Sequence, residues 1–170
     1  MGSTRTPFAV KGGGHATNPG FSSTTGVQIS MTRFNETNVN STCGTVEVGP
    51  GLIWDQVYAS LGPTGVNVIG SRLPGVGVAG LTLGGGEFPP PSEISMETRS
   101  HDSHMLLGYS SLTSQYGLAV DNVAGYELVL PNGTIKDVTS NERDLWFGLR
   151  VSRQDQHKLV SLIVFDFRED

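Results

Sequence analysis

Apolar and polar residues alternate in several short segments of the chain, and in one segment the apolar residues recur at helical spacing. The alternation and the short apolar runs predict strands at residues 8–10, 27–31, 45–48, 66–69, 126–130 and 134–138. Apolar positions near one helical turn apart predict a short helix over 52–61, which Gly62-Pro63 ends. Pro131-Asn132-Gly133 is typical of a β-hairpin turn, and Asn141 is expected to cap a short helix. Strands interleaved with short helices predict an α+β fold.

Composition narrows the class of protein. Glycine accounts for 23 of 170 residues, well above its usual share of ~7%, and charged residues for only 16% against the usual ~25%. The glycines follow no G-x-y period, so collagen is excluded and the excess is expected at turns and ligand loops. A net charge of −5 with scattered basic residues argues against a nucleic-acid partner. No apolar run approaches the roughly 18 residues of a membrane helix, so no membrane partner is expected.

Neither the cysteine content nor the targeting signals identify the cellular compartment of the protein. The single cysteine, Cys43, excludes an internal disulfide and a cysteine-built metal site. The first residues lack the apolar core of a signal peptide, whereas three glycosylation sequons favour a secretory ancestor; they begin at Asn35, Asn40 and Asn132. The sequence therefore leaves the compartment open, and it leaves the oligomeric state open as well.

Two glycine-rich segments could each surround an anion with backbone amides. Lys-Gly-Gly-Gly-His occupies 11–15, and residues 75–80 match G-x-G-x-x-G. The second pattern is also the dinucleotide fingerprint, but Arg72-Leu73-Pro74 separates it from the preceding strand and further glycines follow in place of a good helix. Two other interpretations remain: a loop that binds an anion through its backbone amides in another fold, and a tight turn with an exposed His15. His101 and His104 lie in a stretch without periodicity, and we expect no metal site there.

Taken together, the segments resemble the FAD-binding domain of the vanillyl-alcohol-oxidase superfamily, which has the PCMH-type fold. The resemblance is greatest to fungal enzymes related to berberine bridge enzyme and to the oligosaccharide oxidases. It covers about 120 residues through ordered motifs at 8–16, 18–22, 46–58, 75–86 and 112–123. It implies a partial FAD-binding PCMH-type domain over residues 1–150, incomplete at both ends.

The resemblance implies FAD as the cofactor, with its pyrophosphate in the glycine loops and a covalent bond from His15 to the flavin 8α carbon. Many members carry a second bond from a cysteine two residues before the G-x-G run, where this chain has Leu73, so one link is implied. The implied cofactor-binding residues are Gly12, Gly13, Gly14, His15, Ala16, Gly75, Val76, Gly77, Gly80, Gly85, Gly117, Asp121, Asn122 and Val123.

The implied reaction is flavin-dependent oxidation of an alcohol or carbohydrate C–H in a small-molecule substrate, with oxygen as the acceptor. No catalytic residue is expected in this chain, because the family's substrate domain has no counterpart in it, and the chain alone is expected to be inactive. The alternatives are a remnant or gene-model fragment that binds no cofactor and, more distantly, a nicotinamide-binding module.

Two stretches depart from the family pattern. Relatives pass directly from the triple glycine to the residue matching Tyr109, so residues 87–108 are interpreted as an insertion. After Arg150 the family motifs fade, and residues 151–170 are interpreted as an unrelated tail. Codons for both junctions can contain splice signals, which suggests retained intron sequence; a genuine loop insertion with a diverged tail is the alternative.

Overall fold

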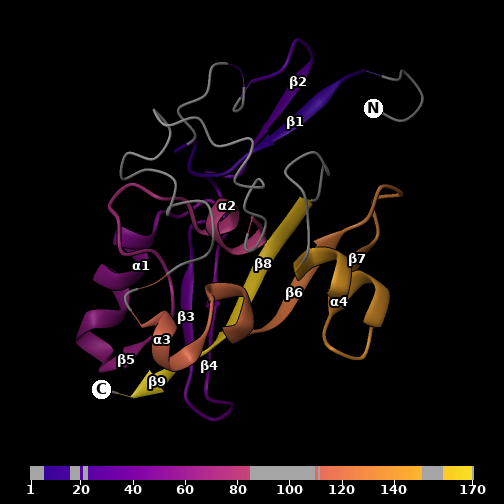
Figure 1. Ribbon diagram of the computed structural model, residues 1–170. Coiled ribbons are helices and arrows are strands. Elements are labelled where there is room, and N and C mark those ends of the chain that lie inside the picture. The colour runs from indigo at the N-terminus through magenta and orange to yellow at the C-terminus, as the bar shows by residue number, and fades with distance from the viewer. Residues whose placement is uncertain are drawn as a thin grey trace, which may run out of the picture.

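The computed structural model describes residues 6–15, 20, 23–84, 110, 112–150 and 159–169 (Figure 1). The helices and strands in these ranges are β1 (Phe8–Lys11), β2 (Val27–Ser30), β3 (Thr37–Asn40), β4 (Thr45–Val48), α1 (Trp54–Leu61), η1 (Gly62–Thr64), β5 (Val66–Asn67), α2 (Val78–Leu83), α3 (Thr113–Tyr116), η4 (Ala119–Asn122), β6 (Val123–Val129), β7 (Ile135–Val138), α4 (Arg143–Arg150), β8 (Leu159–Asp166) and β9 (Arg168–Glu169). The mixture of helices and sheets confirms the predicted α+β class.

A five-stranded antiparallel sheet forms the centre of the fold. Its strand order is β3-β4-β8-β6-β7. Trp54, the first residue of α1, is completely buried, and its ring packs edge-on against Phe165 of β8 with 5.5 Å between centroids. Helix α1 and the sheet therefore share one hydrophobic core.

The central strand β8 corrects the expected boundary at residue 150. Residues 159–166 pair with β4 on one side and with β6 on the other, so they belong to the domain and are not an unrelated tail. The run Leu-Val-Ser-Leu-Ile-Val-Phe is rich in β-branched and apolar residues, which is the pattern of a buried strand. The interpreted insertion at 87–108 and residues 151–158 lie outside the described ranges.

Strands β1 and β2 form a separate parallel pair that precedes the five-stranded sheet in the chain. Figure 1 shows this pair at one end of the molecule, above α2 in this view. The hydrogen bonds continue beyond β2, because the N–H of Met31 donates to the carbonyl of Lys11 at 2.9 Å. The end of β1 is thereby fixed, and the glycine loop at 12–15 starts from this fixed point.

The N-terminus of α4 differs from the prediction. The N–H of Trp146 donates to the carbonyl of Glu142 at 2.8 Å, so Glu142 holds the N-cap position that we expected for Asn141. The Glu142 carboxylate accepts the backbone N–H of Thr139 at 3.1 Å and the Thr139 hydroxyl at 3.2 Å. The polar residues before α4 were recognisable as a helix start, but only the bond from Trp146 to the Glu142 carbonyl identifies the N-cap residue.

We expect Glu142→Gln to destabilise the fold at neutral pH and to have little effect in acid. The Thr139 backbone bond is the main reason why the pKa of the Glu142 carboxyl lies below its usual value. A depressed pKa in the folded state contributes stability above the unfolded pKa of about 4.3, and this contribution is lost as the pH falls through the folded value. Thermal unfolding at pH 7 and pH 3 measures the difference, with the exposed Glu36→Gln as the control. An equal loss at both pH values would contradict the assignment.

Candidate cofactor-binding site

The two glycine loops, far apart in sequence, are in direct backbone contact. A Cβ atom on Gly13 would lie 2.6 Å from the Cα atom of Gly77, and one on Gly77 would lie 2.7 Å from the backbone nitrogen of Gly13. Real Cβ atoms essentially never approach other atoms this closely, so both positions require glycine. The structure thus unites two segments that the sequence analysis could only treat separately.

The second loop is held by the first two residues of α1. The N–H of Gly75 donates to Asp55 Oδ2 at 2.7 Å, and the N–H of Trp54 donates to the carbonyl of Val76 at 2.9 Å. Gly75 has a φ of +77°, a conformation that side-chain-bearing residues rarely adopt. Val76 is buried and anchors the loop in the core. Asp55 was not predicted from the sequence, because no local pattern links it to Gly75.

His15 lies beside the second loop. It is exposed, and a Cβ atom on Gly75 would lie 3.5 Å from its Nδ1 atom. Gly13 and Gly14 are also exposed, and a Cβ atom on Gly80 would meet nothing within 4 Å. Exposed glycine backbone beside an exposed imidazole fits a phosphate-bearing cofactor that can bond to histidine. Ala16 and Gly85, which were also predicted to bind the cofactor, lie outside the described residues.

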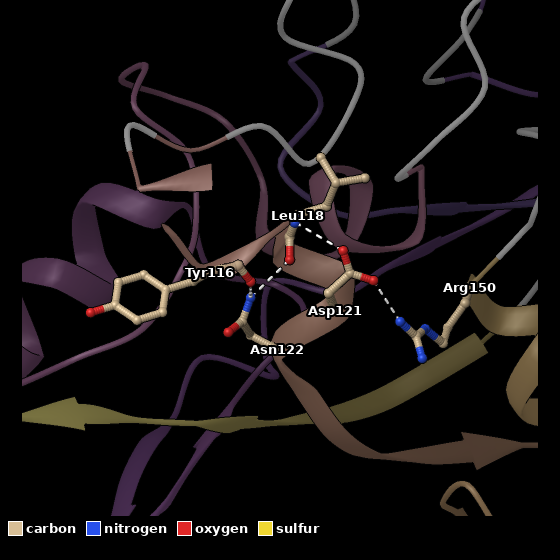
Figure 2. Close-up of polar contacts among 5 residues, drawn as sticks. All are labelled: Tyr116, Leu118, Asp121, Asn122 and Arg150. Atoms are coloured by element: carbon tan, nitrogen blue, oxygen red, sulfur yellow. Dashed lines mark hydrogen bonds and ion pairs between the residues drawn. The ribbon is translucent and has the colours of Figure 1, made fainter. Parts of the chain in front are cut away.

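The third predicted segment, residues 117–123, forms a closed turn (Figure 2). Asp121 accepts the N–H of Leu118 through Oδ2 at 3.0 Å, and the amide of Asn122 donates to the carbonyls of Tyr116 and Leu118, both at 2.9 Å. Asn122 is 3% exposed. The Asn122 amide therefore bonds within the turn, whereas the Asp121 carboxylate bonds both to the turn and to Arg150 outside it.

The turn lies next to the second glycine loop. Its 3₁₀ helix, η4, packs against α2, and α2 also contacts α4. Gly117 begins the turn with φ +78° and ψ −164°, a region that only glycine occupies readily. Val123 is buried at the start of β6. All the predicted segments within the described residues therefore converge around α2.

Three further features concern the described residues: a cavity, the lack of a metal-binding cluster and the lack of a membrane-spanning helix. A cavity of about 510 Å³ is lined by residues that include Tyr58, Leu61, Val66 and Leu112, and its lining contains none of the predicted cofactor residues. Within the described ranges, no group of three or more histidine, cysteine, aspartate or glutamate side chains could hold a metal ion. No helix among them is long and apolar enough to cross a membrane.

The fold and the paired glycine loops fit a domain that binds a phosphate-bearing cofactor, and comparison with known families identifies that cofactor. A family model for the FAD binding domain matches residues 1–87, half of the chain. The chain belongs to this FAD-binding domain family, and FAD is its cofactor. The resemblance found in the sequence is thereby confirmed.

Individual relatives are consistent with this family. The chain is 40% identical over 150 residues to FAD-dependent monooxygenase FUP4 of Fusarium proliferatum, a match that covers 87% of this chain and 25% of the relative. A solved structure of Physcomitrella patens BBE-like 1 matches with a TM-score of 0.78 at 24% identity, over 99% of this chain and 32% of the other. Glucooligosaccharide oxidase from Acremonium strictum matches with a TM-score of 0.72 at 20% identity, over 98% and 31%.

These matches confirm the partial PCMH-type domain. The chain spans about a quarter of the length of the curated relative and about a third of each solved structure. At the identities found, the solved structures show the fold alone.

Proposed function

We propose that this chain supplies the FAD-holding part of an oxidoreductase that oxidises an alcohol or carbohydrate C–H with oxygen as the acceptor. The observation that supports this most directly is the position of His15 beside two glycine loops whose backbones touch. Bound FAD would supply the hydride acceptor. Asp55, through its bond to the N–H of Gly75, would keep the second loop in the shape that the cofactor requires.

Within this proposal, each predicted residue has a role set by its chemistry. The backbone amides of Gly12–Gly14 and of the second loop would bind the pyrophosphate. The amides of Gly75 and Val78 are excluded from this role, because they donate to Asp55 Oδ2 and to the carbonyl of Leu52. His15 would carry the single covalent bond to the flavin. The FAD of the Acremonium strictum oxidase is described as 6-S-cysteinyl, 8α-N1-histidyl FAD, with two links. Here Leu73 packs partly against the hydrophobic core and has no thiol, so we assign it no link.

The substrate is assigned only as a small molecule. The named relatives include monooxygenases and an oligosaccharide oxidase, and most of their length lies outside the match. Hydride transfer requires a donor carbon held near the flavin and a base positioned for the hydroxyl proton. We place neither function in this chain. Positioning of the reactants alone can lower the activation barrier by roughly 7–11 kcal/mol. Without it, the 170-residue chain is not expected to turn over substrate.

Expression and purification of the chain test the proposal. A yellow product with the absorption bands of protein-bound flavin supports it, and a colourless product after incubation with FAD favours the alternative of a remnant that binds no cofactor. Protection from proteolysis by NAD(H) in place of FAD would indicate the nicotinamide-binding alternative. Peroxide formed by the purified chain with a sugar or alcohol would contradict the expected inactivity.

A further inference from the structure

We infer that Arg150 is a positioning residue for the cofactor site, acting through Asp121 on the turn of residues 117–122. The inference rests on the proposed role of that turn beside FAD. Arg150 lies at the end of α4, and neither the glycine loops nor the family motifs identify it. Figure 2 shows its guanidinium directed at the carboxylate of Asp121.

The Asp121 carboxylate connects two parts of the chain. Its Oδ1 atom accepts Arg150 Nη2 at 2.6 Å, while Oδ2 accepts the N–H of Leu118 at 3.0 Å. A Cβ atom on Gly117 would lie 2.9 Å from Oδ2, so the carboxylate also lies against the strained glycine. A movement of the carboxylate therefore moves the backbone that faces α2.

Arg150 is itself held in place from the other side. Its guanidinium carbon lies 5.5 Å from the centroid of the Trp146 ring, and that ring lies 5.6 Å from the ring of Tyr126. Tyr126 is on β6 and is 2% exposed. A planar cation stacked on an aromatic ring keeps its direction better than a flexible ammonium group would. The sheet thus fixes Trp146, Trp146 directs Arg150, and Arg150 fixes the turn.

The exposure of the Arg150–Asp121 ion pair indicates whether its loss should affect stability or the geometry of the turn. The side chains of Arg150 and Asp121 are 31% and 45% exposed, and ion pairs this accessible add little to global stability. Their effect is expected on the geometry of the turn, and through α2 on the cofactor loops, more than on the free energy of unfolding. A positioning residue should change the geometry of the turn with little change in the free energy of unfolding, whereas a general structural residue should change both.

The test compares Arg150→Met with Arg143→Met, which removes the same charge from the exposed first turn of α4. Amide hydrogen exchange at Leu118, measured without FAD, is expected to speed up in Arg150→Met and to stay unchanged in Arg143→Met. FAD affinity is measured in a His15→Ala background, in which binding is reversible. There Arg150→Met is expected to weaken binding roughly three- to tenfold, with little change in melting temperature.

A double-mutant cycle with Asp121→Asn completes the test. The double variant should bind FAD no more weakly than the worse single variant, because both changes break one interaction. Arg150→Lys should recover only part of the affinity. Unchanged exchange at Leu118, affinity within twofold of the parent, or additive losses would each overturn the inference. If the parent chain binds no FAD, the proposed function fails, while the exchange measurement still decides whether Arg150 holds the turn.

Discussion

Gly77→Ala is expected to force the two glycine loops apart, with a loss of about 1–3 kcal/mol of stability and the loss of FAD binding. The backbone of Gly77, with φ −71° and ψ 141°, is ordinary for alanine, so the effect has a purely steric origin. The new Cβ atom would lie 2.7 Å from the backbone nitrogen and 2.8 Å from the Cα atom of Gly13. Backbone atoms cannot swing aside as a flexible side chain can, so the whole loop has to move.

Gly80→Ala is the matched control for stability. It lies in α2, three residues after Gly77, and its Cβ atom would meet nothing within 4 Å. Alanine in place of glycine in a helix is expected to add up to about 1 kcal/mol. Chemical denaturation of the FAD-free proteins compares the two variants. Equal stability of Gly77→Ala and the parent would contradict the loop contact.

His15→Ala is expected to convert tightly retained flavin into flavin that acid precipitation releases completely. An imidazole nitrogen can form the bond to the flavin, and alanine offers no atom that could replace it. The measurement is the yellow colour of the washed, denatured pellet compared with that of the supernatant. Flavin that remains attached to the His15→Ala protein would contradict the assignment.

Leu73→Met serves as the control for this experiment. It keeps the volume and the apolar character of a partly buried side chain that packs on the core. The flavin should stay in the denatured pellet, because Leu73 carries no link in the proposed arrangement. Release of the flavin from the Leu73→Met protein would show that Leu73 affects flavin attachment although it has no thiol.

Local patterns predicted the parts of the fold that depend on local forces. The strand at 45–48 is found with the predicted bounds, and the helix expected at 52–61 is present as α1, Trp54–Leu61. The run Thr-Asn-Val-Asn of β3 was missed, because a mostly polar edge strand gives little periodic signal. The abrupt change of composition after Arg150 was read as a boundary, whereas the chain returns to the centre of the sheet in β8.

The site was predictable to a similar extent. Glycine spacing located both loops and His15, because close backbone approach requires glycine whatever its partner. The residues that hold the loops, Asp55 and Arg150, act across long sequence separations and follow no motif. Asp121 was predicted as a cofactor residue through the family motif, and its bonds to Leu118 and Arg150 could be seen only in the structure.

The central place of β8 also has a consequence for the order of events during synthesis. The hairpins β3–β4 and β6–β7 join neighbouring segments and can form while the chain is still being made. The two hairpins can become one sheet only after β8 has left the ribosome, since that strand lies between them. Until then each hairpin presents an unpaired inner edge, which is a template for wrong pairing with another chain. We therefore expect the nascent domain to be most exposed to wrong strand pairing in the interval between synthesis of β7 and release of β8 from the ribosome.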